Sequence, residues 1–255
     1  MPQDGGLLRG RVAIVTGGGS GIGRAVALAY AHAGAQVVLS DLDEAGGQET
    51  LAQLAQAGTG TEAHFVRADA ASAADHERLV AETIDRFGAL HIACNNAGIA
   101  GEINPIAQLS ADGWQRVIDI NLSGVFHAMR AQLPRLLEAG GGTIVNISSI
   151  LGQVGTATSA AYVAAKHGVV GLTRTAALEY SALGVRVNAV GPGYIDTPLL
   201  DAVPDAARDA LVALHPIGRL GTAEEVATVV RWLSSDDASF VTGAYIAVDG
   251  GYLAR

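Results

Sequence analysis

The sequence predicts an α/β protein in which a doubly wound, seven-stranded parallel sheet carries helices on both faces. Short apolar runs, typical of strands that are buried on both sides, alternate with longer segments typical of helices. A glycine cluster follows the first apolar run, as expected where a strand turns into a helix. The chain has 255 residues, 49% of them hydrophobic, and shows no internal repeat, low-complexity segment or linker. We therefore expect residues 1–255 to form one domain.

Composition and charge argue against several classes of protein. The net charge of −9 argues against binding to nucleic acid and to anionic membranes. Cys94 is the only cysteine, so we expect neither an internal disulfide nor a cysteine-built metal site, and no motif implies a metal. Residues 1–11 do not resemble a signal peptide, and no stretch of about 18 apolar residues predicts a membrane span. The expectation is a soluble, cytoplasmic protein.

The first strand and helix predict a phosphate-binding turn between them. We expect a buried strand at residues 12–16 and a helix at 22–33, joined by T-G-x-x-x-G-x-G rather than the commoner G-x-G-x-x-G. Glycines here let backbone N–H groups at the helix N-terminus approach a pyrophosphate. A glycine-rich turn alone is weak evidence, but the strand before it and the helix after it strengthen the hypothesis. The expected contacts are Gly17, Ser20, Gly21, Ile22 and Gly23.

An acidic residue closes the second expected strand, at residues 36–40. Asp41 lies 18 residues after Gly23, near the offset at which a carboxylate binds the adenosine ribose hydroxyls. A carboxylate would repel a 2′-phosphate, and no arginine or lysine follows in the turn at 42–44. The sequence therefore predicts NAD rather than NADP as the cofactor. The alternative is a solvated aspartate at the end of a strand.

The next elements complete a β-α-β-α-β-α-β order. We expect helices at residues 43–56 and 73–87 and strands at 63–67 and 90–94. This order predicts a parallel sheet with helices on both faces, and ligands in such sheets bind beyond the carboxyl ends of the strands. Asn95 and Asn96 follow the fourth strand, and by residue type alone they are turn residues.

The second half of the chain continues the pattern. Ser110 is expected to cap a long helix that contains Asn121, and asparagine inside a helix suggests either a functional role or an exposed position. A capping box beginning at Thr222 predicts a later helix. Apolar residues at helical spacing from about 198 to 216 predict an amphipathic lid over a substrate. The remaining expected elements are strands at 143–147, 185–190 and 244–248 and a helix at 160–183.

Tyr162 and Lys166 are the strongest candidates for chemistry. They lie four residues apart in an alanine-rich segment, so a helix places the phenol and the ammonium side by side. Lys166 is the only lysine in the chain, and its compact ammonium suits a site that adjusts a proton better than arginine does. We expect the ammonium to lower the pKa of the phenol, which then exchanges a proton with a carbonyl or alcohol oxygen. The alternative is an exposed pair on a helix.

Two serines follow the fifth expected strand. Ser148 and Ser149 both place a hydroxyl at the carboxyl end of this strand, and by residue type alone either one is a loop-capping residue. A serine hydrolase is not indicated, because no convincing His–Asp pair lies beside them. His167 is adjacent to Lys166 in sequence but points about 100° away around a helix, so we interpret it as structural.

Together these motifs resemble those of the short-chain dehydrogenase/reductase family. The turn at residues 16–23 is similar to the family's cofactor turn, and N-N-A-G at 95–98 is similar to its signature after the fourth strand. Tyr162-x-x-x-Lys166 is similar to its catalytic pair. The resemblance runs in order from about residue 11 to 251, nearly the whole chain, and implies a Rossmann fold.

The resemblance implies roles for further residues. Asp69 would lie at the adenine, Asn96 near the adenosine ribose, and the backbone of Asn121 would hold a water near the lysine. The family serine usually lies 13 residues before the tyrosine, which selects Ser149 over its neighbour. The other implied cofactor contacts are Gly98, Tyr162, Lys166, Pro192, Gly193, Ile195 and Thr197.

Residues 192–197 match the family's P-G-x-x-x-T loop. In that loop the backbone of Ile195 and the hydroxyl of Thr197 would hold the nicotinamide carboxamide and fix which face of the ring meets the substrate. By residue type alone the segment is a proline-glycine turn without a chemical role. The short tail through Arg255 resembles that of relatives that assemble as homotetramers.

The first hypothesis is an NAD-dependent alcohol dehydrogenase or ketone reductase. Tyr162 would be the general acid/base, and Lys166 would lower its pKa and hold the nicotinamide ribose. Ser149 would polarise the carbonyl, and Asn121 would support a proton relay. Apolar loops favour an uncharged secondary alcohol, hydrophobic or cyclic; these residues are Ile99, Ala100, Ile150, Leu151, Val154, Tyr194 and the lid leucines. The alternatives are a 3-oxoacyl thioester (acyl-carrier-protein) reductase and, outside enzymes, an NAD-binding sensor.

Overall fold

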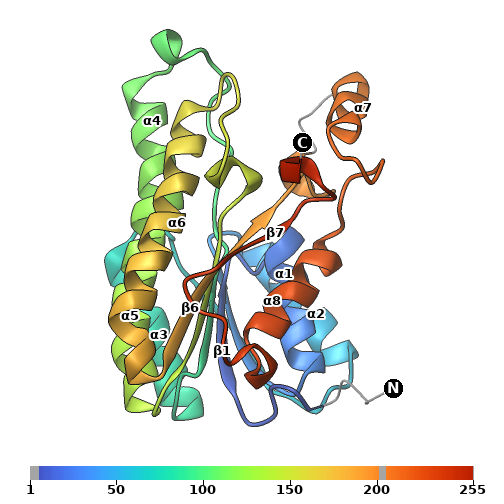
Figure 1. Ribbon diagram of the computed structural model, residues 1–255. Coiled ribbons are helices and arrows are strands. Elements are labelled where there is room, and N and C mark those ends of the chain that lie inside the picture. The colour runs from blue at the N-terminus through green and yellow to red at the C-terminus, as the bar shows by residue number, and fades with distance from the viewer. Residues whose placement is uncertain (1–5, 201–204, 255) are drawn as a thin grey trace.

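The central strands of the sheet are short apolar runs buried on both faces, whereas the edge strands are only partly buried. The computed structural model describes residues 6–200 and 205–254, and in these residues seven parallel strands pair in the order β3-β2-β1-β4-β5-β6-β7 (Figure 1). Helices cover both faces, so the predicted fold class is confirmed. The strands are β1 (Val12–Thr16), β2 (Gln36–Asp41), β3 (Ala63–Arg67), β4 (Ile92–Asn95), β5 (Gly142–Ile147), β6 (Val185–Pro192) and β7 (Tyr245–Val248).

The helices divide between the two faces. In Figure 1, α1, α2 and α8 lie on one side of the sheet, and α3, α4, α5 and α6 lie on the other. Side chains of Asp43, Ser72, Ser110 and Thr222 cap the helices that follow them, and Thr222 forms the predicted capping box with Glu225. The helices are α1 (Gly21–His32), α2 (Glu44–Gln56), α3 (Ala73–Phe87), α4 (Ala111–Ile118), α5 (Gly124–Glu138), α6 (Ala160–Tyr180), α7 (Asp205–Ala213) and α8 (Ala223–Leu233).

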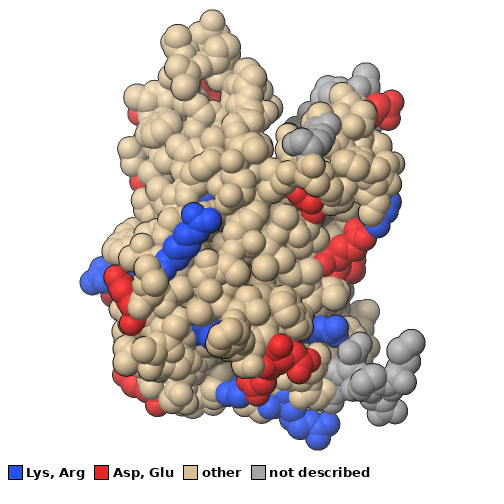
Figure 2. All heavy atoms as spheres, in the orientation of Figure 1, with Lys and Arg blue, Asp and Glu red and all other residues tan. Residues whose placement is uncertain are grey.

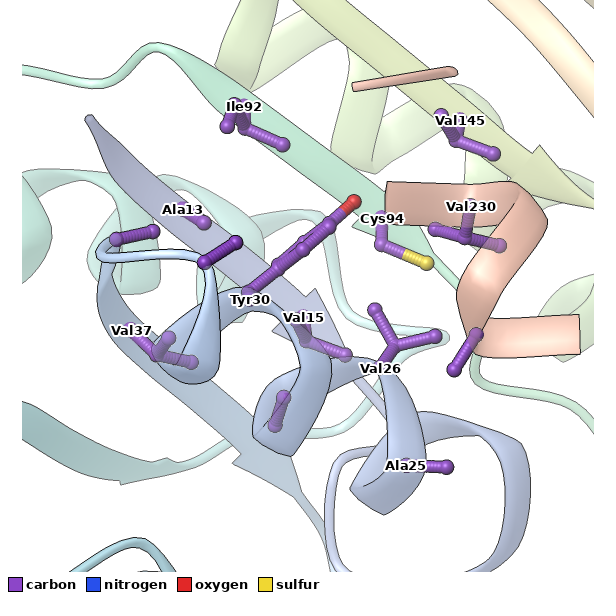
Figure 3. Close-up of a cluster of buried hydrophobic side chains, with 14 of the residues drawn as sticks. Ala13, Val15, Ala25, Val26, Tyr30, Val37, Ile92, Cys94, Val145 and Val230 are labelled. Atoms are coloured by element: carbon purple, nitrogen blue, oxygen red, sulfur yellow. The ribbon is translucent and has the colours of Figure 1, made fainter. Parts of the chain in front are cut away.

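Two hydrophobic clusters hold the layers together, one on each face of the sheet. One lies between the sheet and α1 and α8 and includes Tyr30, Cys94 and Val230 (Figure 3). The other lies between the sheet and α3, α5 and α6. Burying each large apolar side chain contributes roughly 1.5–3 kcal/mol, so these clusters fix the sheet whose ends carry the site. The Tyr30 hydroxyl, enclosed in the first cluster, is satisfied by Ser234 Oγ at 2.7 Å.

Strand boundaries match the sequence prediction to within two residues, but two helical segments differ from it. The long helix expected after Ser110 is interrupted by a π-helical turn, Asp119–Ser123, between α4 and α5. The helix expected to reach residue 183 ends at Tyr180 and continues as the 3₁₀ turn Ser181–Leu183. No helix in the described part of the chain is both long and apolar enough to span a bilayer.

The expected lid is helical where the structure describes it. A 3₁₀ turn, Pro198–Leu200, follows β6, and α7 occupies Asp205–Ala213. Residues 201–204, including the expected lid residue Val203, lie outside the described residues.

Candidate active site

The glycine turn between β1 and α1 has the shape of an anion-binding site. Gly17 and Gly21 have positive φ angles of 64° and 49°, which side-chain-bearing residues rarely adopt. A Cβ on Gly23 would overlap the carbonyl oxygen of Gly17. The side chain of Ser20, at the N-cap of α1, makes no capping hydrogen bond, and the first turn of α1 contains no acidic residue. The first N–H groups of this helix, including that of Ile22, therefore have no acceptor from the helix's own cap or first turn and suit an anion.

Asn96 fastens this turn to the end of β4. Its side-chain amide donates to the carbonyl oxygens of Thr16 and Gly17, at 3.0 and 3.1 Å. The Thr16 hydroxyl accepts the N–H groups of Asn96 and Ala97 in return. Asn96 therefore has a defined structural partner beyond its expected place in a turn, and it brings the carboxyl ends of β1 and β4 together.

Asn95 is not a turn residue, because it ends β4 with its side chain buried. Its amide donates to Gln132 and Asn146, and the Asn146 amide donates to Thr173 at 3.0 Å. These side chains come from β4, α5, β5 and α6, so the network ties both central strands to the helices behind them. Sequence analysis missed it, because a paired buried amide has no local sequence signature.

Asp41 and Asp69 lie at neighbouring strand ends, on the side of the glycine turn away from α6. The Asp41 carboxylate accepts the N–H of Gly19 at 2.9 Å and that of Asp43 at 3.0 Å. Asp69 accepts the N–H of Ala71 at 2.9 Å. Asp41 is thus more than a solvated strand-end carboxylate, since it braces the turn and places a negative charge beside it.

Lys166 is buried, which contradicts the alternative of an exposed helix pair. Only 4% of its surface is exposed, and its ammonium donates to the carbonyl oxygen of Ile147, at the end of β5, at 2.8 Å. The Nζ atom lies 5.5 Å from the centre of the Tyr162 ring, one helical turn earlier in α6. Burial disfavours the charged form and lowers the pKa of Lys166 to about 8.

The expected lowering of the Tyr162 pKa is not found in the structure. Burial of the phenol raises the pKa of Tyr162 to about 12, opposed by a hydrogen bond with the Ser149 side chain and reinforced by Tyr194. The Tyr162 side chain is nevertheless only partly buried, so it remains accessible from solvent. The prediction was wrong here for two reasons. It considered the attraction between the ammonium and the phenolate but not the desolvation of the phenol, and Lys166 directs its ammonium at a carbonyl oxygen.

The two serines after β5 have different partners. Ser149 is hydrogen-bonded to Tyr162, and its Oγ accepts the N–H of Leu151 at 3.1 Å. Ser148 donates to the backbone carbonyl oxygen of Lys166 at 3.0 Å. The serine that the resemblance selects is therefore the one beside the phenol, while Ser148 fixes α6 to the sheet. His167 bonds the Val163 carbonyl on its own helix.

Asn121 is fully buried in the π-helical turn, so it is not an exposed helix residue. Its side chain accepts the N–H of Ile99 at 2.9 Å and donates to the carbonyl oxygen of Ile99 at 2.8 Å. A Cβ on Gly98 would stand 3.2 Å from Asn121 Oδ1 and 3.6 Å from Lys166 Nζ. Asn121, Gly98 and Lys166 thus occupy one small region, and π turns of this kind are frequent at functional sites.

The loop after β6 reaches back to the glycine turn. Pro192 ends the strand, and the N–H of Gly193 donates to the carbonyl oxygen of Val248 at 2.9 Å. Thr197 donates to the carbonyl oxygen of Ile195 at 3.3 Å. A Cβ on Gly21 would lie 3.3 Å from the Thr197 side chain, so this loop stands over the start of α1.

His215, after α7, is a further residue of this region that sequence analysis missed. Its Nε2 accepts the N–H of Tyr194 at 3.2 Å, while Nδ1 bonds the carbonyl oxygen of Leu211 at 2.8 Å. Its ring also contacts those of Tyr194 and Tyr252. The base of the expected lid is therefore connected to the loop after β6. Among the described residues, no group of three or more His, Cys, Asp or Glu could hold a metal ion.

These features define a class of protein: oxidoreductases that bind a dinucleotide at the carboxyl ends of a doubly wound sheet. A family model described as enoyl-(acyl carrier protein) reductase matches residues 17–253. Cyclohexanol dehydrogenase of Acinetobacter sp. is 49% identical, with 96% of both chains covered. Cis-4-hydroxycyclohexanecarboxylate dehydrogenase of Sinomonas cyclohexanicum is 48% identical, covering 96% of this chain and 97% of that one.

More distant relatives agree on the family. A 3-oxoacyl-(acyl-carrier-protein) reductase of Thermotoga maritima is 36% identical, covering 96% of this chain and 98% of that one. The crystal structure of levodione reductase matches with a TM-score of 0.94 at 39% identity, covering 97% of this chain and 99% of that one. The chain belongs to the short-chain dehydrogenase/reductase family, and it is an oxidoreductase of secondary alcohols and ketones.

Proposed function

We propose that the protein is an NAD-dependent dehydrogenase that interconverts an uncharged alicyclic secondary alcohol and its ketone. The observation that carries the proposal is the meeting of Tyr162, Lys166 and Ser149 at the carboxyl end of β5, on the same edge of the sheet as the glycine turn. The glycine turn and the loop after β6 would hold a dinucleotide across this edge, with the three side chains at its nicotinamide end.

The residues present fit such a cofactor. Glycines at positions 17, 21 and 23 leave room where a Cβ would meet backbone or side-chain atoms, and the uncapped start of α1 suits a pyrophosphate. Asp69 and Asn96 would contact the adenosine half, while Ile195 and Thr197 would contact the nicotinamide half. When bound, the cofactor supplies the hydride acceptor or donor.

Asp41 is the basis for preferring NAD to NADP. Its carboxylate is fixed by the N–H groups of Gly19 and Asp43, so its charge stays beside the glycine turn. Ribose hydroxyls can donate to this carboxylate, whereas a 2′-phosphate would be repelled by it.

The protein groups divide the proton chemistry among them. In alcohol oxidation, Tyr162 acts as the base that removes the hydroxyl proton, and in ketone reduction it returns that proton to the carbonyl oxygen. Ser149 donates a hydrogen bond to the same oxygen. Lys166, whose ammonium lies 5.5 Å from the centre of the Tyr162 ring, would stabilise the phenolate as it forms and would hold the nicotinamide ribose. The backbone of Asn121 would hold a water that relays protons.

Apolar surroundings favour an uncharged substrate. Ile99 packs with Val117, Ala161 and Tyr162 in a small hydrophobic cluster, and Tyr194 lies close enough to Tyr162 to affect its pKa. Figure 2 shows a notch at the top of the molecule, between the parts that contain α4 and α7, and the visible surface on its α4 side is mostly uncharged. A six-membered ring alcohol such as cyclohexanol fits this chemistry, and the relatives that act on ring alcohols support it.

The main alternative is a 3-oxoacyl thioester reductase, which the description of the family model and the relative from Thermotoga maritima favour. The net charge of −9 opposes it, since such enzymes receive their substrate from an acidic carrier protein.

The test is a panel of cyclohexanol, linear secondary alcohols and a 3-oxoacyl thioester. Each substrate is assayed with the NAD and the NADP form of the cofactor, and the reaction rate is measured by the absorbance of NADH or NADPH. We expect the highest kcat/KM for the ring alcohol with NAD. Preference for the thioester would overturn the proposal, and tight NAD binding without turnover on any substrate would indicate a sensor.

We further propose that the chain works as one domain with residues 198–216 as its lid, assembled as a homotetramer. Large apolar side chains are exposed on two separate surfaces, which supports assembly through both. Trp114, Phe126 and Leu178 lie on α4, α5 and α6, while Trp232 and Phe240 lie on and after α8. Light scattering in solution tests this, and a monomer would contradict it.

A further inference from the structure

Tyr245 makes a contact with the candidate serine that the proposed roles do not explain. Its hydroxyl donates to the carbonyl oxygen of Ser149 at 2.8 Å, although the two residues are 96 positions apart. Tyr245 begins β7 at one edge of the sheet, whereas Ser149 follows β5, and β6 runs between these two strands. The side chain therefore spans the width of a strand to reach its partner.

Gly191 provides the space for that crossing. A Cβ on Gly191, near the end of β6, would overlap the hydroxyl oxygen and ring of Tyr245. Gly191 has no positive φ angle, so its backbone conformation does not require glycine. The absence of a side chain at this position is explained by the Tyr245 ring that passes over it.

The bond from Tyr245 completes the set of contacts that fixes Ser149. The carbonyl oxygen of Ser149 also accepts the N–H of Gly152 at 2.8 Å, so both of its lone pairs are used. The hydroxyl of the same residue accepts the N–H of Leu151, which leaves its proton free to point towards Tyr162 and a substrate oxygen. Of these contacts, only the one from Tyr245 comes from a distant part of the chain.

We propose that Tyr245 is a positioning residue that holds the backbone of Ser149 so that the serine hydroxyl is aimed at the substrate oxygen. The inference rests on the proposed function, because it acts through the role assigned there to Ser149. Burial and the nearby Asp249 raise the pKa of Tyr245, so the phenol remains a protonated donor through the working pH range.

The test is a double-mutant cycle on kcat for ring-alcohol oxidation. We expect Tyr245→Phe to lower kcat about tenfold with the KM for NAD unchanged, since one hydrogen bond is lost and the serine is less well aimed. In a Ser149→Ala background, Tyr245→Phe should have no further effect, because the hydroxyl that it positions is gone. Equal losses in both backgrounds, or no loss in either, would overturn the proposal.

Three further measurements separate positioning from general destabilisation. Gly191→Ala, which keeps the Tyr245 hydroxyl but displaces it, should reproduce the loss of kcat. Tyr30→Phe is the matched control, because it removes another hydrogen-bonded tyrosine hydroxyl; it should lower thermal stability and leave kcat unchanged. Hydrogen exchange of the Leu151 and Gly152 amides, measured without cofactor, should be faster in Tyr245→Phe, and unchanged exchange contradicts the inference.

The outcomes also distinguish this inference from the proposed function. A wild-type protein that oxidises no alcohol contradicts the proposed function and this inference with it. An active wild type with an unimpaired Tyr245→Phe variant contradicts the inference alone.

Discussion

The ammonium of Lys166 is held where little water can solvate it, and this placement links stability to pH. Below pH 8 the lysine is protonated in the folded and the unfolded chain, so the full penalty of burial applies. As pH rises from about 8 towards the ordinary value of 10.5, the folded chain releases the proton while the unfolded chain keeps it. The unfolded state then binds more protons, and the free energy of unfolding rises.

Replacing Lys166 with methionine should remove this pH dependence. We expect the free energy of unfolding of the wild type to rise relative to Lys166→Met by up to about 3 kcal/mol between about pH 8 and about pH 10. Urea unfolding of both proteins at several pH values in this window measures the difference. A difference that is constant, or that falls as pH rises, would show that the ammonium is not buried as described.

At the scale of elements, the glycine turn should lose its affinity for the cofactor when a side chain at Gly23 prevents the close packing of Gly23 against Gly17 and Asn96. Gly23→Ala places a Cβ against the Gly17 carbonyl oxygen and 2.6 Å from the Asn96 amide, so the turn must open. We expect NAD affinity to fall by about a hundredfold or more, comparable with losing several kcal/mol of contacts. Gly171→Ala in α6 is the matched control, since its added Cβ meets nothing within 4 Å beyond the adjacent backbone of its own helix. It should leave affinity unchanged, and equal affinities in all three proteins would refute the assigned turn.

Elements could be predicted from the sequence wherever burial imposes a local pattern. The strand β1 begins and ends at the predicted residues, because a strand buried on both faces must be apolar along its length. The edge strand β3 also matches its predicted bounds, although it is only partly buried. The π-helical turn around Asn121 could not be predicted, since it depends on Ile99, 22 residues away. The contact between Tyr245 and Ser149 is likewise invisible in sequence, because side-chain pairs so distant share no periodicity.

The candidate site itself was predicted mostly through motifs rather than through geometry. Tyr162 and Lys166 were found from their spacing, and the structure places them together. The direction of the Tyr162 pKa was missed, because desolvation depends on packing from several elements and not on the neighbour four residues away.

At the scale of the whole molecule, cofactor preference should appear as a difference in thermal stability. A ligand at about 100 times its Kd stabilises the fold by about 2.7 kcal/mol, so the cofactor that binds more tightly raises Tm more. We expect NAD to raise Tm more than NADP at equal concentration. Asp41→Asn, which removes the charge but keeps an acceptor for Gly19, should narrow that difference. An equal response of the wild type to both cofactors would contradict the role given to Asp41.

The account as a whole depends on Tyr162 exchanging a proton with an alcohol oxygen beside the nicotinamide. The most direct test is the rate of NADH formation from cyclohexanol by the wild type and by Tyr162→Phe, with NAD affinity measured in both as a control for folding. We predict that kcat falls by about a thousandfold or more, within the range that general acid–base catalysis supplies, while NAD affinity changes little. A Tyr162→Phe variant that binds NAD and turns over cyclohexanol at the wild-type rate would contradict the account.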